Sequence, residues 1–81
     1  MKQKIFYRRD DARKAAAELM NETEGEIRLI EVDDRSKLLS EAEGDEEFVE
    51  KVENRGGWSG TMMAIAVEKD REYIGVFGFW E

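Results

Sequence analysis

The spacing of apolar residues predicts a strand followed by a helix at the start of the chain. The run "KIFYR", residues 4–8, is short, apolar and aromatic, as is typical of a strand. Asp10 or Asp11 can then cap a helix in which alanines and Leu19 recur at helical spacing. We expect this helix to stop at Gly25, because glycine readily adopts the left-handed conformation that ends helices.

The segment "EIRLIEV", residues 26–32, predicts a second strand that is apolar on both faces. Ile27 and Leu29 lie on one face, while Ile30 and Val32 lie on the other. A bulge near Leu29 would reconcile this pattern, but a strand covered on both faces explains it more simply. We therefore expect residues 26–32 to lie in the centre of a sheet.

Two short helical pieces follow. Ser36 is the expected cap of the first piece, which Gly44 interrupts, and Asp45 is the expected cap of the second. Residues 54–57 end the second piece. The apolar positions of the two pieces are Leu38, Leu39, Ala42, Phe48, Val49 and Val52.

The last third of the chain changes to the period of two that is typical of strands. The segments at 61–68 and 73–80 are both apolar on both faces, and the charged "EKDRE" lies between them. This pattern predicts an antiparallel hairpin with a loop of about three to five residues.

The predicted order is therefore β-α-β-α-β-β, in a single α+β domain that spans residues 1–81. The first β-α-β passage is long enough for a crossover that makes its two strands parallel, and the hairpin adds antiparallel strands to give a mixed sheet. We expect a two-layer sandwich with its helices on one face of the sheet.

Composition then narrows the chemistry. The chain has no cysteine and no histidine, which removes disulfides, zinc–thiolate sites and the usual general base near neutral pH. The acidic segments at 31–36 and 41–47 lack the ligand spacing of a calcium loop. We expect a protein that is not an enzyme and that has no metal and no cofactor.

The chain also has no apolar run of the ~18–20 residues that cross a bilayer, and its first ten residues do not resemble a signal peptide. These absences predict a cytoplasmic protein that does not contact a membrane.

Charge gives the chain its most distinctive feature. The net charge is −7, and residues 21–55 carry five basic and thirteen acidic side chains, or −8. Such a balance argues against direct binding to nucleic acid, which normally requires a basic surface. It favours a basic protein as the partner, because the acidic field would steer such a protein toward the chain.

Seven of these carboxylates lie within the fourteen residues 40–53. Carboxylates along a helix can imitate the phosphates of a nucleic acid, but the solvated face of an ordinary helix has the same composition. The loop "RGGWSG" that follows presents Trp58 either as an aromatic anchor for a partner or as a cover for the edge of the core. The predicted partner-binding residues are Glu41, Glu43, Asp45, Glu46, Glu47, Glu50, Glu53 and Trp58.

The last strand offers a second candidate surface. If helices cover one face of the sheet, the other face shows one of two large apolar sets, and such patches are typical of dimer interfaces. The two sets are Tyr73, Phe77 and Phe79, the predicted interface, and Ile74, Val76 and Trp80. Alternatively, Gly75 and Gly78 mark bends, and the ends of the chain cover this patch.

The sequence therefore supports two hypotheses. The first is an inhibitor that binds a basic nuclease or nucleoprotein complex as a nucleic-acid mimic, such as an anti-CRISPR or anti-restriction factor of a phage or mobile element. The second is an assembly module that forms a homodimer through its C-terminal strands and is acidic only for solubility.

Overall fold

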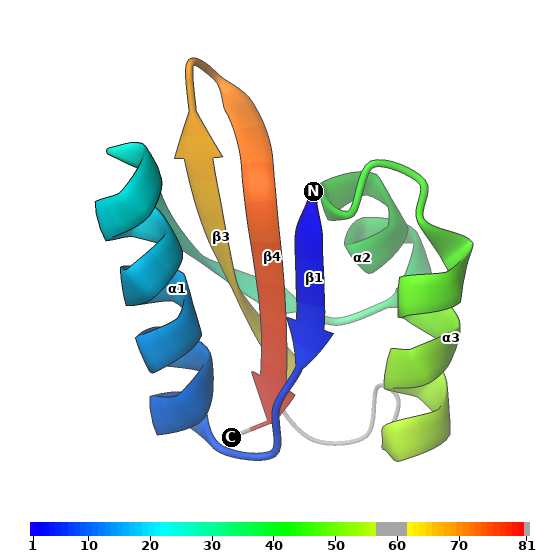
Figure 1. Cartoon of the computed structure of the whole chain (residues 1–81). Coiled ribbons are helices and arrows are strands. Elements are labelled where there is room, and N and C mark those ends of the chain that lie inside the picture. Colours follow the sequence, from blue (N-terminus) through cyan, green and yellow to red (C-terminus); the bar gives the residue numbers. More distant parts are fainter. Residues whose placement is uncertain (57–61, 81) are drawn as a thin grey trace.

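The computed structural model describes residues 1–56 and 62–80, which form a four-stranded mixed sheet and three helices (Figure 1). The α+β class, the mixed sheet and the C-terminal hairpin are confirmed, and the second helical segment is divided into two pieces as predicted. The elements are β1 (Lys2–Ile5), α1 (Arg9–Thr23), β2 (Glu26–Val32), α2 (Arg35–Glu41), α3 (Glu46–Arg55), β3 (Met62–Lys69) and β4 (Glu72–Trp80).

The strand order in the sheet is β1-β4-β3-β2. β1 is parallel to β4, and both β4 and β2 are antiparallel to β3. The first two strands therefore run in the same direction, as predicted, but at opposite edges of the sheet with the hairpin between them. The expected central position of residues 26–32 was wrong, because β2 is an edge strand.

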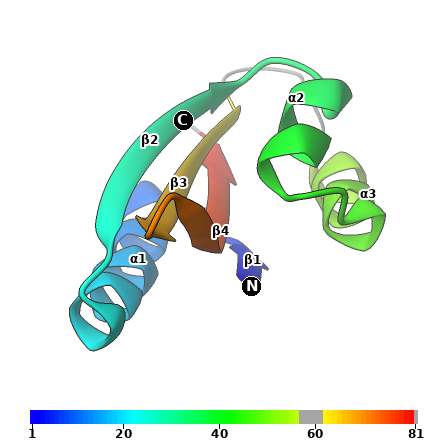
Figure 2. The same cartoon turned by 90° about the horizontal axis from the view of Figure 1, so that it is seen from above.

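Helices cover both faces of the sheet (Figures 1 and 2). One core forms between α1 and the sheet, and the other forms between the sheet and the α2–α3 pair. The expected arrangement of two layers was thus wrong, and the domain has three. The reason is that β3 and β4 are apolar on both faces, and each of those faces must be covered.

Helix caps explain where α2 and α3 begin. The Asp45 side chain accepts a hydrogen bond from the Phe48 N–H at 3.1 Å, which confirms the predicted cap of α3. At α2 the cap is Asp34, which accepts from the Lys37 N–H at 2.8 Å, and the prediction of Ser36 was wrong by two residues.

The ends of α1 differ from the prediction as well. The residue at its N-cap position is Arg8, whose side chain makes no capping hydrogen bond, and Asp10 and Asp11 lie in the first turn. Carboxylates in the first turn interact favourably with the helix dipole. At the other end, Glu24 rather than Gly25 adopts the left-handed conformation, with φ of 57°.

The β3–β4 hairpin is tighter than predicted. Only Asp70 and Arg71 connect the strands, and both have left-handed φ values, 53° and 69°, that match the twist of a two-residue hairpin. Further along, Ile74 is an extra residue in β4, because Glu68 pairs with Tyr73 while the preceding residue of β3 pairs with Gly75. This bulge moves Tyr73 to the face that α2 and α3 cover.

Candidate functional site

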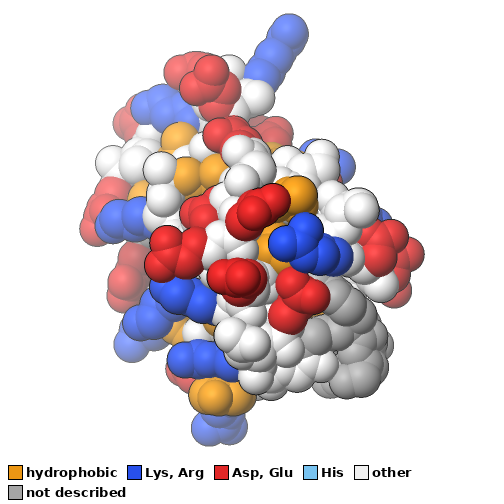
Figure 3. All heavy atoms as spheres, turned by 90° about the vertical axis from the view of Figure 1, so that its right-hand side faces the viewer, with side chains coloured by type: hydrophobic (Ala, Val, Ile, Leu, Met, Phe, Trp, Pro, Cys, Tyr) orange, Lys and Arg blue, Asp and Glu red, His pale blue; other side chains and the backbone are white. Residues whose placement is uncertain are grey.

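Helix α3 presents one apolar side to the sheet and an acidic side to solvent. Phe48, Val49 and Val52 are buried, as their spacing predicted. Figure 3 shows this side of the molecule, where Asp and Glu side chains gather with Lys and Arg side chains among them. The exposed carboxylates of α3 are those of Glu46, Glu47, Glu50 and Glu53.

Two of these four glutamates have basic partners. Glu53 Oε1 lies 3.1 Å from Arg35 Nε of α2, and Glu47 Oε1 lies 3.9 Å from Lys51 Nζ one turn along α3. Exposed pairs of this kind contribute at most about 1 kcal/mol each to stability. Each pair places a cation beside its carboxylate, which the other two glutamates of α3 lack among the described residues.

Two further predicted site residues, Glu41 and Asp45, are half-buried and serve the fold. Asp45 caps α3, as described above. The Tyr73 hydroxyl donates a hydrogen bond to the carboxylate of Glu41 at the end of α2, and it accepts one from Arg28 Nη1 at 2.7 Å. Burial of Tyr73, together with its hydrogen bond to Glu41, raises the pKa of the hydroxyl to about 12.

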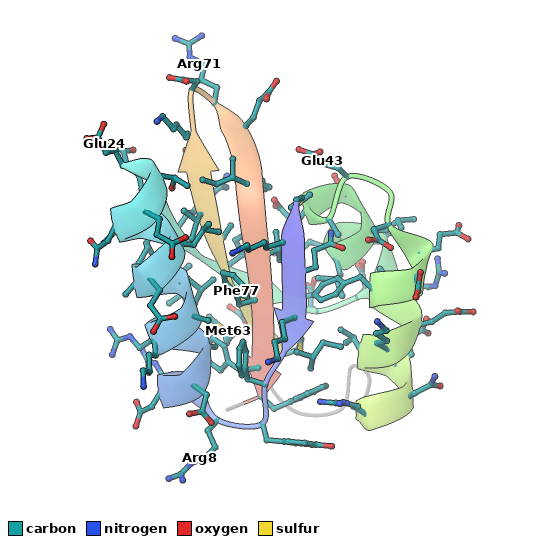
Figure 4. All side chains as sticks on the ribbon, viewed as in Figure 1. Arg8, Glu24, Glu43, Met63, Arg71 and Phe77 are labelled. Atoms are coloured by element: carbon teal, nitrogen blue, oxygen red, sulfur yellow. The ribbon has the colours of Figure 1, made fainter. Side chains whose placement is uncertain are left out.

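Three predicted carboxylates remain, those of Glu43, Glu46 and Glu50, which we call the unpaired glutamates. All three are exposed, and none has an ion-pair partner in the part of the chain that the structure describes. Glu43 has a left-handed φ of 56° in the α2–α3 turn and points away from the domain (Figure 4). Glu46 and Glu50 are four residues apart on α3, where like charges repel weakly.

The predicted anchor Trp58 lies outside the described residues. Just before it, Arg55 at the end of α3 places its guanidinium carbon 5.0 Å from the centre of the Tyr7 ring and donates a hydrogen bond to the Ile5 carbonyl at 3.4 Å. Through these two contacts, Arg55 holds the end of α3 against the end of β1.

A hollow of about 460 Å³ lies between β1 and α3. It could not be predicted from the sequence, because these elements are far apart in the chain. Its walls combine three cations with two carboxylates, so neither sign of charge dominates. The lining residues are Gln3, Lys4, Ile5, Asp45, Glu47, Phe48, Lys51, Asn54 and Arg55.

The aromatic residues of β4 do not form an exposed patch. Phe77 and Phe79 are buried on the α1 side, and Figure 4 shows Phe77 and Met63 between the sheet and α1. Tyr73 lies on the opposite face, against the other core. The proposed dimer interface at Tyr73, Phe77 and Phe79 therefore has no common exposed surface in this fold.

The described residues show no arrangement for metal binding and no buried charged group. Within residues 1–56 and 62–80, no three acidic side chains come together as metal ligands, and no polar or charged side chain is buried. None of the described helices is long and apolar enough to cross a membrane.

Comparison of the chain with known protein families, with curated protein sequences and with solved structures finds no significant match.

Proposed function

We propose that this protein is not an enzyme and that it binds and inhibits a basic protein through Glu43, Glu46 and Glu50. The observation that carries the proposal is that three exposed carboxylates without basic partners in the described chain follow one another along the α2–α3 turn and α3, whereas Glu47 and Glu53 of the same helix have such partners. Repulsion between Glu46 and Glu50 costs a few tenths of a kcal/mol and does not help the fold. A cationic surface would remove that repulsion on binding.

Enzymes that process nucleic acids are the class of partner that fits this chemistry best. Their binding channels carry Lys and Arg side chains that contact a row of phosphates. Carboxylates in sequence on a turn and a helix offer such a channel a comparable row of negative charge. An anti-CRISPR or anti-restriction inhibitor of a phage or mobile element would act in this way.

The test is capture of the partner from a bacterial lysate at low and at high salt. The site variant combines Glu43→Lys, Glu46→Lys and Glu50→Lys. The matched control combines Glu18→Lys, Glu22→Lys and Glu72→Lys, which are exposed positions outside the site. Each variant has a net charge of −1, because three Glu→Lys changes add six units to −7.

We expect the native protein and the control to retain a basic, nucleic-acid-processing protein at low salt and to release it at high salt. The site variant should retain none at either salt concentration. Equal retention by the site variant and the control would show that net charge, and not the unpaired glutamates, governs binding.

A further inference from the structure

The outer edge of β2 is the one long strand edge that the described part of the fold leaves open. β2 is the last strand of the sheet and has seven residues, and Figure 2 shows no described helix or strand beside its outer edge. The opposite edge strand, β1, has only four residues, and Arg55 donates a hydrogen bond to its Ile5 carbonyl. Open edges of this length are templates for pairing with another strand.

On one face of β2, two exposed apolar residues lie beside the exposed Glu31. Ile27 and Leu29 are 45% and 52% exposed, although large aliphatic residues are usually buried. They lie on the α1 side of the sheet, opposite Val67 and Ile65 of β3. Helix α1 buries those two β3 residues but leaves Ile27 and Leu29 largely uncovered.

The other face of β2 carries two opposite charges. Glu26 lies directly opposite Glu68 of β3, and like charges in that position destabilise a sheet. Arg28, two residues further on, is exposed and is hydrogen-bonded to the Tyr73 hydroxyl. An arginine has five N–H donors, so Arg28 retains donors for a second acceptor.

We propose that β2 pairs antiparallel with β2 of a second copy of this chain, about a twofold axis at Ile27. In this register, Glu26 lies opposite Arg28 of the second copy, and Arg28 lies opposite its Glu26. The four side chains of Ile27 and Leu29 from both copies meet on the other face. Gly25 lies opposite Leu29 of the second copy, so the pairing involves residues 25–29 of each chain.

Charge complementarity favours this register, and it favours a second copy of the chain as the strand that pairs with the open edge of β2. A twofold axis at Arg28 would place Arg28 opposite Arg28 of the second copy. An axis at Leu29 would place Glu26 opposite Val32 and Arg28 opposite Ile30, and both of these partners are apolar. Of these registers, only the axis at Ile27 pairs Glu26 with Arg28 of the other copy. The dimer is weak, because two chains of net charge −7 repel each other. It uses β2 and not α3, so it is independent of the proposed function.

The first test is sedimentation equilibrium of the full chain between about 10 μM and about 1 mM, the range in which weak association is measured. The mean mass of the native protein should rise toward twice that of the monomer. Leu29→Lys should remain monomeric. Ser40→Lys, which adds the same charge at an exposed residue of α2, should associate like the native protein.

The second test is a charge swap. Glu26→Arg and Arg28→Glu should each weaken the dimer by about tenfold or more, because each creates like-charge pairs across the axis. The double variant restores opposite charges and should return the dissociation constant to within about threefold of the native value. Circular dichroism of each variant checks that the fold is retained.

Three results would overturn the proposal. They are a native protein that stays monomeric over the whole concentration range, association that survives Leu29→Lys, and a double variant that associates no better than the single variants.

Discussion

Tyr73 is the residue at which three elements meet. Its hydroxyl, on β4, interacts with Glu41 of α2 and with Arg28 of β2. These contacts hold the end of α2, where the acidic segment of residues 40–53 begins, against the sheet. Because the Glu41 carboxylate interacts with Tyr73, its role is to stabilise the fold more than to bind a partner.

The raised pKa of Tyr73 predicts a loss of stability at high pH. Its pKa is about 12 in the folded chain and 10.0 in the reference state, so the unfolded state releases this proton first as the pH rises. The contribution is therefore complete below pH 10 and is lost between about pH 10 and pH 12. Urea unfolding of native protein and Tyr73→Phe across this range should show a smaller pH dependence in the variant. Tyr7→Phe is the matched control, because it removes the chain's other tyrosine hydroxyl, and it should behave like the native protein.

Gly75 illustrates a close approach between a helix and the sheet. The sequence suggested a bend at this glycine, and the bulge at Ile74 lies next to it. A Cβ atom at Gly75 would also overlap Leu19 Cδ2 of α1 and press against the Phe77 ring. The missing side chain thus lets α1 lie close to β4.

Gly75→Ala should lower the free energy of unfolding by about 1–3 kcal/mol, which is typical of overpacking a core. Adding Leu19→Ala removes the overlapping atoms, so the double variant should be more stable than the sum of the two single losses predicts. Chemical denaturation of the four proteins measures this coupling. Strict additivity would show that the contact between Gly75 and Leu19 is not what limits the size of residue 75.

Among the helices and strands, the acidic segment of residues 40–53 has two roles, helix capping and charge on the surface. The sequence alone predicts a single partner-binding surface for its carboxylates. Gly44 and the left-handed Glu43 divide the segment into α2 and α3, as the glycine predicted. Asp45 then begins α3 as a cap, while Glu46 and Glu50 project into solvent. Substitution at Asp45 can separate these two roles.

Asp45→Ala should cost about 1 kcal/mol of stability, because the Phe48 N–H loses its acceptor. Asp45→Ser keeps a capping oxygen but removes the charge, so it should retain most of the stability. Thermal unfolding compares the three proteins. If Asp45→Ser also abolished capture of the basic partner, Asp45 would belong to the binding surface and not only to the cap.

Local patterns in the sequence predicted most elements but not how they are layered. The alternation in residues 73–80 indicated a strand that is apolar on both faces. The sequence-based prediction nevertheless placed all helices on one face of the sheet, so it left the other apolar face exposed to solvent. Only tertiary packing shows that α1 covers Phe77 and Phe79 while α2 and α3 cover the opposite face. The same limit applies to β2, where Ile27 and Leu29 suggested a central strand but lie exposed at an edge.

The division of the acidic site also depends on contacts that sequence cannot show. The pair between Arg35 and Glu53 joins two helices, and the contact between Glu41 and Tyr73 joins residues far apart in the chain. The composition of residues 40–53 predicted an acidic surface. The structure reduces seven candidate carboxylates to three without partners in the described chain: Glu43, Glu46 and Glu50.

At the scale of the whole molecule, the proposed inhibitor and the proposed dimer use different elements. The unpaired glutamates lie on the α2–α3 turn and on α3, which cover one face of the sheet. The β2 edge lies at the rim of the sheet. A dimer through β2 would therefore leave the glutamates of both copies free to bind partners.

The salt dependence of binding to the captured partner, once purified, tests whether the unpaired glutamates recognise it by charge. Raising the salt from about 0.05 M to about 0.5 M should weaken binding of the native protein and of the Glu18, Glu22 and Glu72 control by about tenfold or more, because exposed charges are screened. The Glu43, Glu46 and Glu50 variant should bind weakly at both salt concentrations. An affinity that is the same at both salt concentrations, or unchanged in that variant, would contradict the proposed electrostatic recognition.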